Sequence, residues 1–353
     1  MSRRSFLKWL IGLTAMLATA WLAFYKWLSG SDSPYTVLSN GDAEPDPSPA
    51  TSVKVTPTPE PPSAVPLLSL FVLSDMHVSM YDATTSEKLK LALNDVSAFE
   101  TPVDTILLGG DLTDYGTPME YGLLKDILAA YKLPKLHGNM GNHDYYDVWI
   151  DKNGGFNTAA LPNGKTDAQS RQRFQQFLGY EKPYHAEVMN GVLLVMLSQE
   201  AYMQERPEVG EGAWYSEEQL HWLKAKLAEH TDGKPILVLI HQPLPNQGED
   251  GGSHRLIPAK AFRDMLKPYP NVFVVSGHTH QDFDNGTTHY IKETFHWIVN
   301  ASVGRTRSGG QVKSQGLYVQ FYKDRVELRG REFSKKAWID AARWSIPLER
   351  AKA

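Results

Sequence analysis

The chain of 353 residues contains no cysteine. This absence excludes disulfide bonds, thiolate nucleophiles and cysteine-ligated metal sites. A metal ion in this protein must therefore be held by His, carboxylate, amide or water ligands, a set that suits borderline to hard ions such as Zn, Fe and Mn. A chain without cysteine also tolerates an oxidising compartment, although the absence alone does not establish export.

Strong net charge is missing as well, because 36 Lys and Arg residues stand against 40 Asp and Glu residues, which gives a net charge of −4. A charge this small gives no global electrostatic reason to expect nucleic acid as a partner. The motifs described below have no basic cluster beside them, so we expect no nucleic-acid partner. The chain has no internal repeat, and its length allows one large domain or two small ones.

The N-terminus has the features of a targeting segment. Arg3, Arg4 and Lys8 precede an apolar run from Trp9 to Leu28 that only Lys26 interrupts. A run of about 17–25 apolar residues can span a bilayer as a helix, with the flanking basic residues on the cytoplasmic side. We therefore expect residues 1–28 to be a signal or anchor segment that places the remainder of the chain outside the cell.

The residues from Ser2 to Lys8, Ser-Arg-Arg-Ser-Phe-Leu-Lys, resemble the twin-arginine export signal. The resemblance implies the export machinery as a partner, whereas the alternative interpretation is a basic flank before an ordinary membrane anchor. Ala18-Thr19-Ala20 fits a cleavage site, but a cut there leaves Trp21 and its apolar neighbours exposed, which favours an uncut anchor through residues 9–28. The sequence thus predicts an exported protein that is either anchored at the extracellular face of the membrane or secreted.

Residues 29–66 are rich in Ser, Pro, Asp, Thr and Gly and show almost no apolar periodicity. Such a segment cannot bury enough apolar surface to offset its ordering entropy, so we expect a disordered linker. From residue 67 the pattern changes to short apolar runs, and we expect one domain over residues 67–334. The tail, residues 335–353, is expected to be a helix packed on that domain.

Short apolar runs alternate with amphipathic segments through the domain. The runs have strand length and end in polar or glycine-rich residues: Leu67–Leu73, Thr105–Leu108, Lys135–Met140, Val192–Leu197, Ile236–Ile240 and Val272–Ser276. Helical patterns lie between them: Glu87–Phe99, Pro118–Tyr131, Gln169–Leu178 and a helix that opens at Ser216. This alternation predicts an α/β domain. The later runs near Phe295–Ala301, Gly316–Phe321 and Val326–Arg329 have no helices between them and predict a second sheet stacked on the first.

Residues that bind metals follow five of these expected strands. The segments are Asp75-Met76-His77, Gly110-Asp111-Leu112-Thr113-Asp114, Gly141-Asn142-His143-Asp144, His241-Gln242-Pro243 and Gly277-His278-Thr279-His280. Each segment alone is weak evidence, since a single His after a strand is more often structural and Gly-Asp is usually a turn. Five such segments in succession, three of them beside glycine, predict one shared metal site at the carboxyl ends of the strands.

This motif set resembles the calcineurin-like metallophosphoesterase superfamily. The sequence from Asp111 to Tyr121 is similar to that of the cyclic-nucleotide phosphodiesterase and purple-acid-phosphatase-like branch. The protein phosphatase branch has Glu at the position of Asp144, so this chain departs from that branch. The resemblance implies a four-layer αββα sandwich of two mixed sheets flanked by helices. It also implies two metal ions of unknown identity, divalent or trivalent Mn, Zn or Fe.

The resemblance also assigns roles to particular residues. The first metal ion would be bound by Asp75, His77 and His280, and the second by Asn142, His241 and His278, with Asp111 bridging both. The catalytic His of the family matches His143, which would give a proton to the leaving alkoxide, and Asp144 would orient that imidazole. From the residues alone, Asp114 is either a hydrogen-bond partner of the ligands or a turn residue.

Two metal ions held by these residues suit the hydrolysis of phosphate esters, because they activate water, neutralise phosphoryl oxygens and hold the ester for in-line attack. We therefore expect a hydrolase of phosphomonoesters or phosphodiesters. One alternative is a phosphodiesterase specific for cyclic nucleotides or for phospholipid or wall-polymer diesters. Another alternative is a non-catalytic metal-binding scaffold, which the complete ligand set does not favour.

Overall fold

The computed structural model describes residues 65–230, 233–307 and 312–349 of the chain. The expected targeting segment at residues 1–28 and residues 29–64 of the expected linker lie outside the described residues. Within the described part, the protein contains no helix with the length and apolar character needed to cross a membrane.

The first sheet combines the earliest strands of the domain with its last ones. In the order β12-β11-β10-β1-β2-β3, its strands are Ala337–Pro347, Arg325–Glu332, Gln315–Phe321, Leu68–Leu73, Thr105–Gly109 and Lys135–Asn139. Strands β1, β2 and β3 are parallel, whereas β10 runs antiparallel against β1. Sheet one is therefore mixed.

The second sheet is built from the middle of the chain. In the order β4-β5-β6-β7-β9-β8, its strands are His185–Met189, Val192–Met196, Ile236–Leu239, Val272–Ser276, His296–Val299 and Tyr290–Lys292. Strands β5, β6, β7 and β9 are parallel, and the edge strands β4 and β8 pair antiparallel. Each sheet thus contains a set of neighbouring parallel strands, β1, β2 and β3 in sheet one and β5, β6, β7 and β9 in sheet two.

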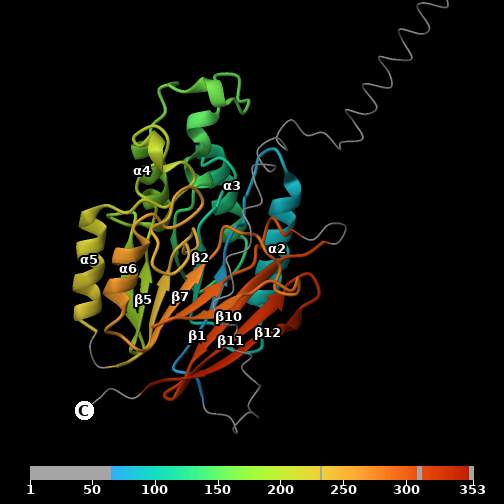
Figure 1. Ribbon diagram of the computed structural model, residues 1–353. Helices are drawn as coiled ribbons and strands as arrows, with labels where there is room; N and C mark the ends of the chain where they lie inside the picture. The colour runs from blue at the N-terminus through green and yellow to red at the C-terminus, as the bar shows by residue number, and fades with distance from the viewer. Residues whose placement is uncertain (1–64, 231–232, 308–311, 350–353) are drawn as a thin grey trace, which may run out of the picture. The chain divides into compact units, whose positions relative to one another are not determined.

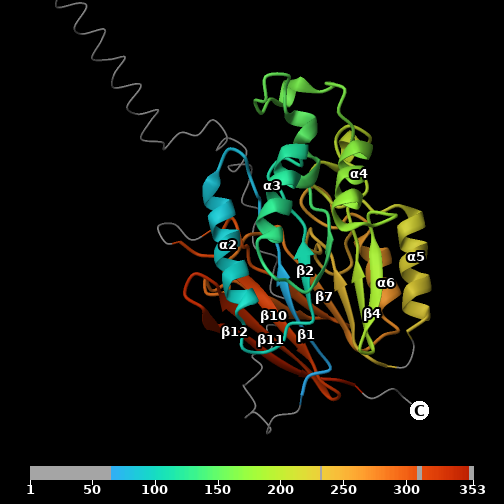
Figure 2. The same ribbon diagram turned by 180° about the vertical axis from the view of Figure 1, so that it is seen from behind.

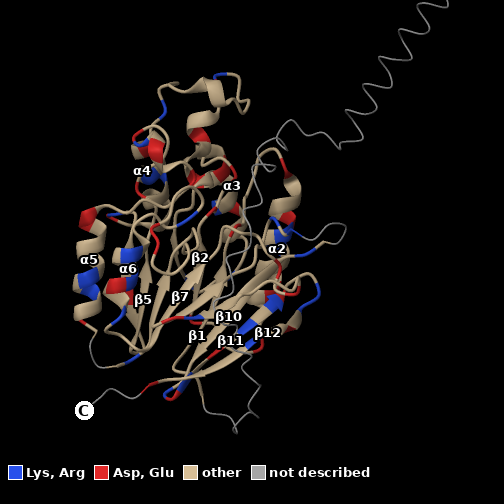
Figure 3. Ribbon diagram, in the orientation of Figure 1, with Lys and Arg blue, Asp and Glu red and all other residues tan. Residues whose placement is uncertain are grey.

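Helices cover both sheets (Figures 1 and 2). The α-helices are α2 (Ala83–Ser97), α3 (Pro118–Ala129), α4 (Asp167–Leu178), α5 (Glu217–Ala228) and α6 (Ala259–Leu266), and the short 3-10 helices are η2 (His143–Trp149), η3 (Thr158–Ala160) and η4 (Pro207–Val209). A capping box opens α3, since the Thr117 side chain accepts from the Glu120 amide and the Glu120 side chain accepts from the Thr117 amide. Lys and Arg on the helices are interspersed with Asp and Glu (Figure 3).

Three buried hydrophobic clusters separate four layers. Alternate residues of β1 divide between two of them, because Phe71 packs against α2, α3 and α4 while Leu70 faces the second sheet. Packing follows the same rule in sheet two, where Leu237 faces the first sheet and Val238 packs against α5 and α6. The order helix, sheet, sheet, helix confirms the expected α/β fold with two mixed sheets flanked by helices.

The assignment of strands to sheets differs from our expectation. The sequence suggested that the early strands form one sheet and the late strands another, but β10, β11 and β12 extend sheet one, and β8 and β9 join sheet two. The reason is that β10 pairs directly with β1, which stands at the opposite end of the domain in sequence, through the register Leu70 to Val319. Apolar periodicity identifies a strand but carries no information about its partner.

The expected helix in the tail was wrong. Strand β12 spans Ala337–Pro347 and pairs antiparallel with β11. Ala342 and Ile346 are buried while Arg343 between them is exposed, so the apolar residues here recur with a period of two. The tail therefore completes sheet one instead of packing on the outside of the domain.

Candidate metal centre

The predicted ligands lie directly beyond the strands of both sheets. Asp75 and Asp111 each stand two residues after the last residue of β1 and β2, and His241 and His278 stand two residues after β6 and β7. Asn142 follows β3 by three residues. Because β1, β2 and β3 are parallel, as are β6 and β7, these positions meet at one edge of the sandwich.

The backbone is strained at this edge. Left-handed φ angles occur at five of the predicted ligands: Asp75 (54°), His77 (46°), Asp111 (48°), His278 (70°) and His280 (55°). A residue with a Cβ adopts this conformation at a cost of order 1–3 kcal/mol, and such strain persists where the surrounding structure fixes it. The concentration of strain on the predicted ligands marks this edge as the functional site.

The glycines of the motifs allow the ligand-bearing turns to pack against one another. A Cβ at Gly141 would lie 2.2 Å from Asp111 Oδ1, and a Cβ at Gly110, where φ is 76°, would lie 2.4 Å from His241 Nδ1. Both distances are shorter than any real contact, so a side chain at either position would displace a ligand. The Gly-Asp and Gly-Asn pairs in the sequence therefore have a steric cause.

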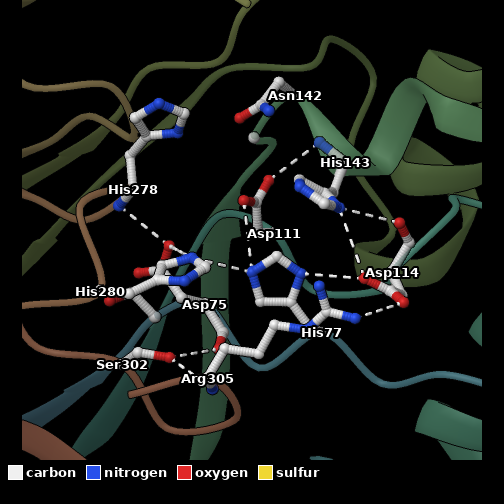
Figure 4. A network of polar contacts seen from close by, with 12 residues as sticks. Asp75, His77, Asp111, Asp114, Asn142, His143, His278, His280, Ser302 and Arg305 are labelled. Carbon is white, nitrogen blue, oxygen red and sulfur yellow. Dashed lines mark hydrogen bonds and ion pairs between the residues drawn. The ribbon is translucent and has the colours of Figure 1, made fainter. Parts of the chain in front are cut away.

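Two groups of donor atoms form around one shared carboxylate (Figure 4). In the first group, His77 Nε2 lies 3.0 Å from His280 Nε2, and His280 Nε2 lies 3.2 Å from Asp75 Oδ1. In the second group, His241 Nε2 lies 3.1 Å from Asp111 Oδ2, and the same oxygen lies 3.6 Å from His77 Nε2. The structure thus places Asp75, His77 and His280 in one group and His241 and His278 in the other, with Asp111 in both.

Asp111 faces both groups with a single oxygen. Its Oδ1 accepts a hydrogen bond of 3.0 Å from the His143 amide, which leaves Oδ2 as the atom directed at His77 and His241. The structure assigns one oxygen to the centre and the other to holding the turn after β3.

Several donors in the centre are buried and have no hydrogen-bond partner among the described residues: Asp75 Oδ2, Asp111 Oδ2, Asn142 Oδ1 and His241 Nε2. A buried polar atom without a partner costs about 1–3 kcal/mol, and more when the group is charged. Cations placed among these oxygen and nitrogen atoms would satisfy all of them. The residues present therefore fit the metal ions that the motif set implies.

Two of the predicted histidine ligands are oriented by a contact to Nδ1, the ring nitrogen that faces away from the centre. His241 Nδ1 donates to the Gly109 carbonyl at 2.9 Å, which turns the other ring nitrogen, Nε2, toward Asp111 Oδ2. His77 Nδ1 lies 3.3 Å from Asp114 Oδ1, so Asp114 is a partner of a ligand and not only a turn residue. Such contacts fix the tautomer and the direction of a metal-binding imidazole.

His143 lies beside the centre, and its partner is Asp114. Its Nδ1 donates to the Asp114 carbonyl at 2.9 Å and lies 3.4 Å from Asp114 Oδ1. Arg305, whose side chain is 38% exposed, donates to the other oxygen of Asp114 at 2.7 Å. The His143 ring stacks on Tyr146 with centroids 4.1 Å apart and is 20% exposed, so one edge of the imidazole remains accessible.

The predicted contact between Asp144 and His143 does not occur. The Asp144 carboxylate accepts from the amides of Leu112, Thr113 and Gly141 and from the Tyr121 hydroxyl. His143 and Asp144 are consecutive in η2, so their side chains leave the helix in different directions. Asp144 therefore ties the turn after β2 to the turn after β3, and the orienting role that we expected of it belongs to Asp114.

Asn142 is held by a residue that the sequence analysis did not single out. Glu211 Oε2 accepts from Asn142 Nδ2 at 2.7 Å and from the Tyr146 hydroxyl at 2.9 Å, and Glu211 Oε1 accepts from the Tyr202 hydroxyl at 2.6 Å. With its Nδ2 donating to Glu211, Asn142 directs its unpartnered Oδ1 the other way. Glu211 follows η4 in a loop without a motif, and no local sequence signal could have identified it.

Burial and neighbouring charges set the protonation of the centre. Burial, together with the charge of His143, lowers the pKa of His77 to about 3, so His77 is neutral. Burial alone would raise the pKa of Asp111, but the charges of His241 and His143 lower it well below its usual range. Burial alone would also lower the pKa of His143, but the charge of Asp111 and the hydrogen bond to Asp114 raise it to about 9. Asp111 and His77 are thus in their ligand forms, and His143 carries a proton at neutral pH.

The comparisons with known proteins agree with this geometry. The family model described as calcineurin-like phosphoesterase matches residues 68–282. The chain is 23% identical over 214 residues to the 3',5'-cyclic adenosine monophosphate phosphodiesterase of Escherichia coli (strain K12), which covers 60% of this chain and 67% of that protein. It is 26% identical over 216 residues to a probable cyclic nucleotide phosphodiesterase of Rhodococcus erythropolis, which covers 59% of this chain and 63% of that protein.

Two solved structures have the same fold. A dimetal phosphatase from Danio rerio matches with a TM-score of 0.56 and 14% identity, over 81% of this chain and 100% of that chain. A purple acid phosphatase from yellow lupin seeds matches with a TM-score of 0.52 and 15% identity, over 80% of this chain and 54% of that chain. At such identities the likeness shows the fold alone.

Proposed function

The chain belongs to the calcineurin-like phosphoesterase family, and on that premise we propose that it hydrolyses phosphate esters with two metal ions at the centre described above. The ligands are Asp75, His77, Asp111, Asn142, His241, His278 and His280. The observation that carries the proposal is the convergence of buried oxygen and nitrogen donors that have no hydrogen-bond partner. When bound, two metal ions supply positive charge for the phosphoryl oxygens and lower the pKa of a water molecule.

The residues of the chain have distinct tasks in this reaction. Asp111 Oδ2 faces both groups of ligands and would hold the two ions together, while Asp111 Oδ1 anchors the turn that carries His143. Because His77 is neutral, the centre keeps a net positive charge, which an anionic ester requires. The guanidinium of Arg305 adds positive charge at the partly exposed edge of the centre.

His143 would protonate the leaving oxygen. Its Nδ1 donates to the Asp114 carbonyl, so Nε2 is the atom that can give a proton to the ester. In the metal-free protein the pKa of His143 is about 9, and a protonated imidazole is the state that an acid needs. In this scheme Asp114 orients His143, and the return of a proton from water restores the acid after each turnover.

The names of the relatives support a second, narrower candidate. Both curated relatives reported above are described as cyclic nucleotide phosphodiesterases, one of them as probable. A diester substrate, with a cyclic nucleotide as one example, is therefore our specific candidate beside phosphomonoesters. We also propose that the enzyme acts outside the cell, on the basis of Arg3, Arg4 and the apolar run from Trp9 to Leu28.

One assay tests the proposal. The full-length chain is purified without metal, supplied separately with Mn, Zn, Fe or Mg, and assayed on an aryl phosphomonoester, an aryl phosphodiester and cyclic AMP. We expect turnover that requires metal, with Asp111→Asn losing on the order of 10³-fold, because metal-ion charge contributes several kcal/mol. The exposed Asp126→Asn on α3 is the matched control and should keep full activity.

The outcomes separate the candidates. The ratio of diester to monoester turnover identifies the substrate class, and cyclic AMP hydrolysis supports the narrower candidate. Absence of turnover with every metal, while two ions are bound, would favour the alternative of a metal-binding scaffold without catalysis.

A further inference from the structure

A second cluster of metal-binding residue types lies where the edges of the two sheets meet. Strand β3 is the last strand of sheet one and β4 is the last strand of sheet two. His137 on β3 and His185 and Glu187 on β4 each direct one donor atom to a common point, with all donors within 4.8 Å of one another. None of these residues belongs to the motifs of the principal centre, and the sequence analysis gave them no role.

The contact between His137 and Glu187 is not a hydrogen bond. His137 Nε2 lies 3.0 Å from Glu187 Oε2, yet this nitrogen is buried and has no hydrogen-bond partner. His137 Nδ1 lies 3.1 Å from the Tyr180 hydroxyl. If Nδ1 donates to Tyr180, the Nε2 lone pair faces a carboxylate oxygen, an arrangement that a cation between the two atoms makes favourable.

The principal centre contains the same arrangement. There, His241 Nε2 lies 3.1 Å from Asp111 Oδ2, is buried and has no hydrogen-bond partner. Two donors that share one metal ion at about 2.0–2.2 Å are separated by roughly 3 Å, which is the spacing seen in both places. The likeness of the two contacts is an internal argument for a cation at the second one.

Packing holds the second cluster in its present geometry. The Tyr180 ring stacks on His185 with centroids 4.4 Å apart, and the His185 and His137 rings lie within 10° of parallel. The Gly138 amide donates to the Tyr180 hydroxyl at 3.2 Å, which fixes this tyrosine against β3. Burial lowers the pKa of His137 to about 4 and also lowers that of His185, so both imidazoles are neutral and keep a lone pair.

We propose that His137, His185 and Glu187 bind one further transition-metal ion, of which Zn²⁺ is the best fit, separate from the principal centre. Two imidazoles and one carboxylate are a ligand set that zinc accepts, with a water molecule in the fourth position. The half-buried state of His185 and Glu187 leaves room for that water. The ion would join the edge of sheet one to the edge of sheet two and stabilise the sandwich.

Lys135 competes with this ion for the carboxylate. Its ammonium group lies 2.5 Å from Glu187 Oε2, the same oxygen that faces His137, and both side chains are partly exposed. The lysine must leave this oxygen when a cation binds. Removal of Lys135 should therefore tighten binding roughly twofold to fivefold, the value of an exposed ion pair.

The test counts metal ions and does not depend on activity. The full-length chain is stripped of metal, incubated with zinc chloride, passed through a desalting column and analysed for zinc per chain. We expect three ions in the wild type and two in His185→Ala and in Glu187→Gln, while the exposed His221→Ala on α5 keeps three. Both altered residues are partly exposed, and circular dichroism checks that the variants fold.

Further measurements keep the proposal open to refutation. In the wild type, zinc at about 100 times the Kd of the additional site should raise the thermal midpoint by roughly 5 °C more than in Glu187→Gln. Equal zinc content in the wild type, His185→Ala and Glu187→Gln would overturn the proposal, whatever the total number of ions per chain. Unchanged or weaker binding of the third ion in Lys135→Met would likewise contradict a site at Glu187. Loss of hydrolysis would leave these zinc counts unaffected, so this inference and the proposed function can fail separately.

Discussion

The two sheets contribute different chemistry to the principal centre. The turns of sheet one supply both carboxylates, Asp75 and Asp111, together with His77, Asn142 and His143, for which we propose the role of proton donor. The turns of sheet two supply imidazoles alone among the predicted ligands: His241, His278 and His280. Negative charge and proton transfer thus belong to one sheet, and the other sheet contributes only imidazole ligands.

This division shows why the sandwich is needed. Asp75 Oδ1 accepts from the His278 amide at 2.9 Å and lies 3.2 Å from His280 Nε2, so contacts of this carboxylate come from the opposite sheet. Buried carboxylates without such partners would be costly, because ionised groups lose their hydration. The cluster of Leu70, Leu237 and their neighbours holds the sheets together and thereby completes the centre.

The largest effect that sharpens this comparison is expected at His143. If proton transfer belongs to sheet one, His143→Ala should lower turnover of alkyl phosphate esters by about 10²–10⁴, the usual contribution of a positioned acid. Aryl esters should lose little, since their leaving groups need no proton. Turnover of both ester types with the metal-loaded variant measures the difference.

The matched control is His254→Ala on the side of sheet two. His254 Nδ1 lies 3.1 Å from His278 Nε2, and its side chain is exposed. His254→Ala should lower the turnover of alkyl and aryl esters by the same factor. If His143→Ala lowers turnover of alkyl and aryl esters equally, His143 is not the acid. Proton transfer could then not be assigned to sheet one.

The candidate donors could be located from the sequence because they lie shortly after the ends of strands. Asp111 and His241 could be assigned from an apolar run that ends in a polar turn, which is a local signal. The partner of His143 could not be assigned in this way. Asp144 is its neighbour in the chain, whereas Asp114 reaches it through the fold over 29 residues.

Pairing between strands that are distant in the chain could likewise not be predicted from the sequence. The apolar residues of β10 and β12 are visible as a pattern, but the contact of β10 with β1 depends on which edge of sheet one is open. Arg305 illustrates the same point, since it reaches Asp114 from a loop 191 residues away and has no motif around it. Local patterns therefore indicated most of the elements, though not strand β12, and located the candidate ligands, whereas the long-range contacts had to come from the structure.

Glu211 tests the division between the two sheets. It is a carboxylate from the side of sheet two, and it accepts a hydrogen bond from Asn142, a predicted ligand on sheet one. Glu211→Gln removes the negative charge of the side chain that accepts hydrogen bonds from Asn142 and Tyr146. Loss of a partner behind a metal ligand typically lowers metal affinity about 10–100-fold. Isothermal titration with Mn²⁺ measures this, and the weaker of the two binding events should change more.

The control for this prediction lies three residues earlier in the chain. Glu208 is exposed and pairs with Arg206 at 3.2 Å, so Glu208→Gln should leave both metal affinities unchanged. If Glu211→Gln also binds both ions with wild-type affinity, metal binding by Asn142 does not depend on the charge of Glu211. Sheet one would then remain the source of the carboxylates that act in the centre.

The smallest expected effect concerns a neutral imidazole far from the centre. His296 on β9 of sheet two stacks on Phe273 and lies 3.1 Å from Lys292 Nζ. Burial, with a contribution from Lys292, lowers the pKa of His296 from 6.5 to about 3. Because the unfolded chain takes up this proton first, stability is highest above pH 6.5 and is lost as the pH falls from there towards 3.

The resulting difference can be measured by urea unfolding of the metal-free protein. For pKa values of 6.5 and about 3, His296 costs about 0.7 kcal/mol of stability between pH 7 and pH 6. His296→Gln should remove that part of the pH dependence while keeping an acceptor for the Tyr290 hydroxyl, and the exposed His221→Gln should leave it intact. An unchanged pH dependence in His296→Gln would mean that the folded protein does not keep His296 neutral as the pH falls from 7 to 6.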